Sequence, residues 1–185
     1  MADENPDSLG KLSDAALNGR IFKISDPNPN AAAVVGATSF SESSPTLVLF
    51  SDVGTKKKIV SYLSLEQKSP VAGGMIEVLV FGDTVKRVSG GGNKNNQIQI
   101  KNPFLSGKFL PEFDFGVNQT LDVAGGSALT LIDRATYPAS LGSTIELDCD
   151  EDWQFSDGNP GTIAIWIISA VTGLSFKHHI EVIQF

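Results

Sequence analysis

The feature that most constrains this chain is a rhythm of short apolar segments that begins at Arg20 and continues to the last residue. Glycine, proline, asparagine, aspartate and serine separate the segments, as they do in turns between strands. No stretch of about 12 residues or more keeps a helical period with capping residues at both ends, which excludes alternating strand–helix–strand units. The chain is therefore predicted to be all-β. Candidate strands lie at residues 20–24, 46–51, 58–65, 75–81, 85–88, 97–101, 120–124, 128–132, 143–149, 162–169 and 175–184.

Several segments alternate apolar and polar residues, as strands with one buried and one wet face do. Segments 46–50, 76–81 and 163–168 are instead apolar on both faces. We expect them to be central strands or strands covered by a partner. About eight to eleven short strands without an internal repeat fit a two-sheet sandwich or a barrel, and a jelly roll is the preferred topology.

The predicted domain division is an arm at residues 1–19 and a single β-sandwich domain at residues 20–185. The arm is polar, small and acidic, and its few apolar residues cannot support an independent helix, so we expect it to be flexible or docked on a partner. The chain has 185 residues, of which 41% are apolar, which suffices for one core. Its single cysteine excludes an intramolecular disulfide. The first residues do not show the basic and then apolar pattern of a signal peptide, so we expect no export by that route.

The formal net charge of −7, from 14 basic and 21 acidic residues, speaks against direct nucleic-acid binding, which needs a dominant basic surface. The longest unbroken apolar run, 163–168, is far shorter than the about 20 residues of a membrane-spanning helix, so no membrane partner is expected. Basic residues gather in segment 55–101 and acidic ones in 133–157. These segments are either solvated surface or two oppositely charged sides suited to head-to-tail packing of copies.

Catalytic candidates are few, because the only histidines are His178 and His179. Neighbours in a strand point to opposite faces, so the two cannot share a site or a metal ion. His178 follows the apolar phase and is predicted to be half-buried, with His179 at the surface. Cys149 continues the apolar phase of its strand and is predicted to be a buried, inert thiol. We expect no enzymatic activity and no cofactor.

An acidic string at residues 146–157 is the most distinctive motif of the sequence. If its strand continued, Asp148, Asp150 and Asp152 would share one face, and their mutual repulsion would favour a hard cation such as Ca²⁺. The string departs from an EF-hand, because Trp153 stands where the obligatory glycine belongs. The alternatives are a looser Ca²⁺ site and a solvated strand end.

Two further features are candidates for contact with a partner. Trp153, beside the acids in an expected loop, could stack on a sugar or a protein, or could simply pack. A turn just before a strand contains Lys56, Lys57 and Lys58. These lysines could meet an acidic partner, could protect a strand edge from pairing, or could simply form a solvated turn. Trp166, inside a doubly apolar segment, is predicted to lie in the core between two sheets.

No motif identifies a family, and the functional expectation follows by elimination. We expect a structural assembly protein, a virion component such as a capsid or capsid-decorating protein of a bacteriophage, built as a homo-oligomer. Its partners would be copies of itself and another shell protein, and it would reside in the virion after synthesis in the host cytoplasm, or otherwise in the cytoplasm. The alternative is a carbohydrate-binding module or the receptor-binding domain of a fibre, and a glycoside hydrolase ranks third.

Overall fold

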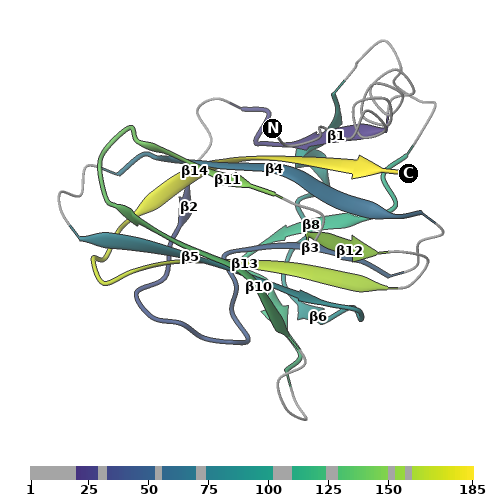
Figure 1. The fold of residues 1–185 in the computed structure, drawn as a ribbon, viewed down its shortest axis with the longest axis horizontal. Coiled ribbons are helices and arrows are strands. Elements are labelled where there is room, and N and C mark those ends of the chain that lie inside the picture. Colours follow the sequence, from purple (N-terminus) through teal and green to yellow (C-terminus); the bar gives the residue numbers. More distant parts are fainter. Residues whose placement is uncertain are drawn as a thin grey trace, which may run out of the picture.

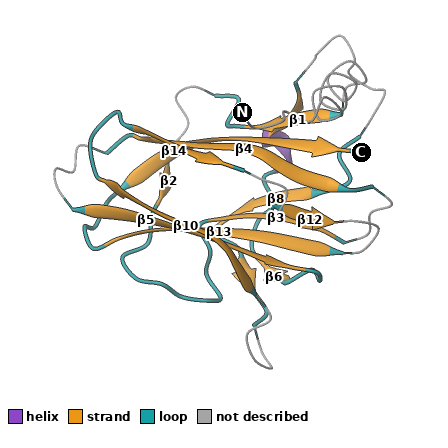
Figure 2. Cartoon of the chain, viewed as in Figure 1, coloured by secondary structure: helices purple, strands orange, loops and turns teal. Residues whose placement is uncertain are grey.

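A computed structural model describes residues 20–28, 33–52, 56–69, 74–101, 110–123, 129–149, 153–156 and 160–185. The arm predicted at residues 1–19 lies outside this part of the chain. Strands dominate the described residues, whose one helical element is the short 3-10 helix η1 (Asn95–Gln97) (Figure 2). The prediction of an all-β chain is confirmed. No helix in these ranges is long and apolar enough to cross a membrane.

Two antiparallel sheets lie one above the other and form a β-sandwich (Figure 1). The first sheet has the order β11 (Thr144–Asp148), β4 (Lys58–Gln67), β14 (Ser175–Gln184), β1 (Ile21–Ile24), β7 (Ile98–Ile100), with β12 (Gln154–Ser156) beside β4 and β2 (Val34–Val35) beside β14. The second has the order β10 (Thr130–Pro138), β5 (Met75–Asp83), β13 (Gly161–Ser169), β3 (Leu47–Ser51), β8 (Asp114–Val117). A small separate pair joins β6 (Val88–Gly90) and β9 (Thr120–Leu121).

The main core lies between the two sheets, where alternate residues of each strand point inward. Leu63 and Leu65 enter from the first sheet and Val78 and Val80 from the second, all fully buried. The period-two pattern of the sequence therefore indicates which residues of each sheet face the core.

The outer face of the second sheet carries another apolar cluster, because β3, β5 and β13 are apolar on both faces. These strands are central, as predicted, and their outer face is covered by the chain itself. Trp166 is fully buried there, with the rings of Phe40 and Phe81 at centroid distances of 5.4 and 5.2 Å. Its indole Nε1 donates a hydrogen bond to the carbonyl oxygen of Ser41 at 2.8 Å.

The position predicted for Trp166 between the two sheets is therefore wrong, although its burial is confirmed. Ile165 and Ile167, its neighbours in β13, take the inward phase and join the main core. Strand alternation then turns Trp166 outward, beneath the segment that contains Ser41.

The strand predictions fail mainly where a strand is short or polar. β2, β8 and β12 were not predicted, since β2 and β12 are brief and β8 contains Asp114 and Gly116, which are poor strand formers. Pairing with β14, β4 and β3 holds them in place. β10 was expected at 128–132 and runs instead to Pro138, because it pairs along β5.

The order of the main strands follows a regular scheme. When β1, β3, β4, β5, β10, β11, β13 and β14 are counted as first to eighth, the first sheet holds the sixth, third, eighth and first. The second sheet holds the fifth, fourth, seventh and second. Most connections between consecutive main strands thus cross from one sheet to the other, and β7 and β8 extend the sheets beyond β1 and β3.

Candidate functional site

A cleft of about 310 Å³ opens where the end of β1, the helix η1 and the first half of β14 meet. Such a volume lies at the lower end of the range of small-molecule sites. The short strand β2 and the residue after β4 complete its walls. The lining residues are Ser25, Asp26, Val34, Lys68, Gln97, Phe176, Lys177 and His178.

Three polar side chains form a chain of hydrogen bonds along this cleft. Gln97 donates from Nε2 to Oδ2 of Asp26 at 3.0 Å, and Oδ1 of Asp26 accepts from the backbone N–H of Asn28 at 2.9 Å. Because its nitrogen is directed to a carboxylate, Gln97 presents Oε1 to Nε2 of His178 at 3.1 Å. This arrangement assigns the imidazole proton to Nε2 and leaves Nδ1 without one in the neutral ring.

Burial keeps His178 neutral at physiological pH. Only 8% of its surface is exposed, and its ring packs on Phe115 at a centroid distance of 5.2 Å. Desolvation lowers the pKa of His178 to about 4, although the nearby carboxylate of Asp26 acts in the opposite direction. The prediction that His178 follows the apolar phase is confirmed, and its burial is more complete than expected.

His179 faces the opposite side of β14, as predicted. Its Nε2 lies 3.4 Å from Oε1 of Glu181, whose Oε2 is 2.7 Å from Nζ of Lys101. Burial raises the pKa of Glu181, but the hydrogen bonds from Lys101 and His179 outweigh it and hold that pKa below its usual value. The two histidines therefore belong to separate environments.

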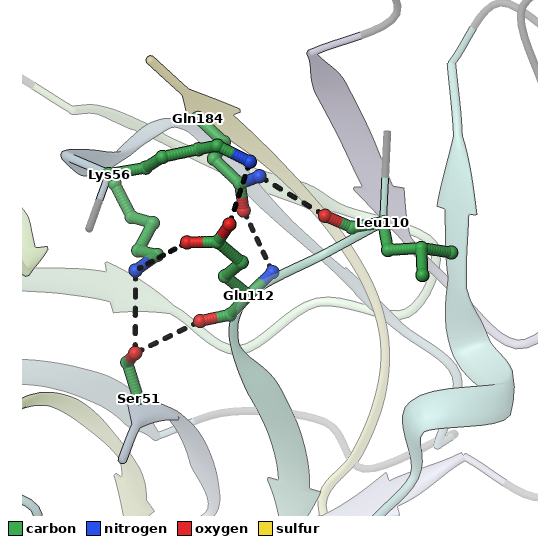
Figure 3. Close-up of polar contacts among 6 residues, drawn as sticks. Ser51, Lys56, Leu110, Glu112 and Gln184 are labelled. Atoms are coloured by element: carbon green, nitrogen blue, oxygen red, sulfur yellow. Dashed lines mark hydrogen bonds and ion pairs between the residues drawn. The ribbon is translucent and has the colours of Figure 1, made fainter. Parts of the chain in front are cut away.

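The three lysines that are candidates for contact with a partner lie in different environments, and Figure 3 shows that of Lys56. Nζ of Lys56 is 2.7 Å from Oε1 of Glu112, and Nζ of Lys58 is 3.9 Å from Oε2 of the same carboxylate. Lys58 is fully buried and also donates to Oγ of Ser51 at 3.4 Å. Burial lowers the pKa of Lys58. The nearby carboxylate of Glu112 acts in the opposite direction, but its effect is smaller, so the pKa stays below its usual value.

The predicted contact with an acidic partner is therefore wrong for Lys58. In β4 this residue has the same phase as Val60, so its side chain points inward and cannot reach a partner. Lys56 is partly exposed but bound to Glu112 of the same chain. Lys57 is half-buried, so a contact through it stays a prediction.

The same network attaches the segment before β8 to the last strand. Oε1 of Gln184 accepts from the backbone N–H of Glu112 at 2.8 Å, and its Nε2 donates to the carbonyl oxygen of Leu110 at 3.1 Å (Figure 3). Gln184 is fully buried, so these bonds satisfy a polar group that would otherwise destabilise the core. The arrangement indicates a structural role.

Trp153, a candidate either for contact with a partner or for simple packing, is 1% exposed and lies in the main core together with Phe155. The contact alternative is wrong and the packing alternative is confirmed, because β12 pairs with β4 and brings the chain back onto the first sheet. The carbonyl oxygen of Trp153 accepts from the backbone N–H of Val60 at 3.1 Å, which holds the indole inside.

The candidate Ca²⁺ ligands fall mostly beyond the described ranges. Asp150 and Asp152 lie outside them, and Asp148 ends β11 opposite Tyr62 in the register. Tyr62 donates from its hydroxyl to Oε1 of Glu146 at 2.8 Å, which raises the pKa of Tyr62. Among the described residues no group of three or more histidines, cysteines, aspartates or glutamates could hold a metal ion, and the Ca²⁺ site stays a prediction.

Cys149, predicted to be a buried thiol, is half-buried and packs against the main core. Its Sγ lies 3.5 Å from the carbonyl oxygen of Leu147. The prediction that Cys149 packs against the core is confirmed, but its side chain is more exposed than predicted.

Sequence reasoning did not find the cleft. Asp26 reads as part of a turn before Pro27, and Gln97 reads as the polar position of an alternating strand. In the structure Gln97 is 7% exposed and ends η1. Nothing in the local pattern predicts the meeting of three residues so far apart in the chain.

Comparison of the chain with protein-family models, with curated proteins and with solved structures gave no match.

Proposed function

We propose that the sandwich is a jelly roll and that the protein is a structural assembly protein, a homo-oligomeric virion component such as a capsid or capsid-decorating protein of a bacteriophage. The strand order is the observation that carries the proposal. Sheets that hold strands 6-3-8-1 and 5-4-7-2 of eight have the order that two nested Greek keys generate.

The step from strand order to function is an analogy at the level of the fold. Jelly rolls build viral shells and also lectin domains. The net charge of −7 favours protein over nucleic acid as the surface that this chain meets. Its partners would be other copies and a further shell protein.

One end of the sandwich offers apolar side chains for such a contact. Met75, at the start of β5, is 54% exposed, and Leu141, in the turn between β10 and β11, is 59% exposed. The backbone N–H of Ala139 donates to the carbonyl oxygen of Gly74 at 3.0 Å, which joins the start of β5 and the end of β10 at the same end of the sandwich (Figure 1). A neighbouring copy that covers both side chains would remove their apolar surface from water.

Sedimentation velocity of the full chain between about 1 and 100 µM tests the proposal, because weak protein contacts have Kd values in this range. We expect species larger than a monomer whose proportion rises with concentration. A chain that stays monomeric throughout this range contradicts the assembly role.

The contact itself is tested by Met75→Glu and Leu141→Glu, which should shift the distribution toward monomer. Val85→Glu is the matched control, because Val85 is 43% exposed and follows the opposite end of β5. Equal effects of all three variants would show that this end is not the contact, while leaving assembly itself in place.

A further inference from the structure

The cleft beside His178 carries an inference that goes beyond assembly. We infer that it binds one neutral, hydroxyl-rich ring, the chemical class of a single sugar residue. The inference rests on how charge, hydrogen-bonding groups and apolar surface are distributed over the lining residues.

The charges of the cleft disfavour an ionic ligand of either sign. Asp26 lies in the lining, and so do Lys177 and Lys68, although the ammonium group of Lys68 is also paired with Glu66. An anion would meet Asp26, and a cation would meet the two lysines. A hydroxyl group both donates and accepts hydrogen bonds, so it can satisfy the two kinds of group without a net charge.

The hydrogen-bonding groups are held in place before a ligand arrives. Asp26 is fixed by two donors, the backbone N–H of Asn28 and the amide of Gln97. Gln97 in turn fixes the ring of His178, and both side chains are more than nine-tenths buried. A polar site that is ordered in advance loses little conformational entropy on binding, which favours a small ligand with few contacts.

Apolar side chains complete the lining. Val34 is half-buried in β2 and is the more accessible of the two, since Phe176, at the adjacent position of β14 in the register, is only 1% exposed. A pyranose has a C–H surface that packs on apolar groups while its hydroxyls point sideways to polar ones. The volume of about 310 Å³ suits a single ring better than an oligosaccharide.

Saturation-transfer NMR and calorimetry of the full chain test the inference. The probes are the methyl glycosides of glucose, galactose, mannose and N-acetylglucosamine, each at about 10 mM, which is above the millimolar Kd expected for one ring. At least one glycoside should bind and shift the ring resonances of His178. Absence of binding by all of these glycosides overturns the inference.

Ser25→Trp fills the cleft without removing a member of the hydrogen-bonded chain, and should weaken glycoside binding at least about tenfold. Ser89→Trp is the matched control, since Ser89 is an exposed serine of β6 outside the cleft, and it should bind as the wild type does. Undiminished binding by Ser25→Trp, or a response to inorganic phosphate in place of the glycosides, also overturns the inference.

Discussion

Acidification from pH 7 to pH 5 should destabilise this protein through His178. In the unfolded chain a histidine has a pKa of about 6.5. In the folded chain burial lowers the pKa of His178 to about 4, so the unfolded state binds more protons across this interval. The stability that burial of the neutral ring provides is present above pH 6.5 and is lost as the pH falls toward 4. Between pH 7 and pH 5 the linkage amounts to about 2 kcal/mol in the free energy of unfolding.

Urea titrations at pH 7, 6 and 5 measure this dependence. His178→Gln should be less stable at pH 7 because it disturbs the bond to Gln97, but its stability should vary much less with pH. The interval ends at pH 5 because the pKa of Glu181 lies below its usual value, so that its contribution is lost only at lower pH. An equally steep loss in His178→Gln would refute the assignment.

Further substitutions test the packing, each by chemical denaturation. Trp166→Ala should cost about 3 to 5 kcal/mol, since it empties a fully buried site beneath the second sheet, and unchanged stability would contradict that burial. Lys58→Met should cost about 1 to 3 kcal/mol by leaving a buried carboxylate oxygen without its cation, while Lys57→Met should stay within about 0.5 kcal/mol. Gly161→Ala should prevent normal folding, because its Cβ would lie 1.6 Å from a backbone oxygen, whereas Gly92→Ala, with nothing within 4 Å, should fold normally.

The local pattern of apolar and polar residues predicts much of the secondary structure. Ile145 and Leu147 alternate with polar residues and face the core, and the doubly apolar segment around Trp166 is a central strand. Strand periodicity is a local property, because successive side chains alternate between the faces whatever lies across from them. The opposite orientations of His178 and His179 follow from the same geometry.

Whether a given side chain is buried or exposed is decided instead by contacts between segments that are distant in the sequence. Trp153 is buried because β12 pairs with β4, and Lys58 is buried because its inward phase meets Glu112. A pattern of residue types favours exposure for a lysine and for a tryptophan among acids, and tertiary pairing overrides both preferences.

The cleft depends on tertiary contacts to the greatest extent. Asp26, Gln97 and His178 come from a turn, a 3-10 helix and the last strand, and each looks ordinary in its own segment. Alternation along the chain predicts that His178 points inward. The neutrality of its ring, its tautomer and the neighbouring carboxylate follow from the packing of β1 and η1 against β14, because desolvation and hydrogen bonding act through space and not along the sequence.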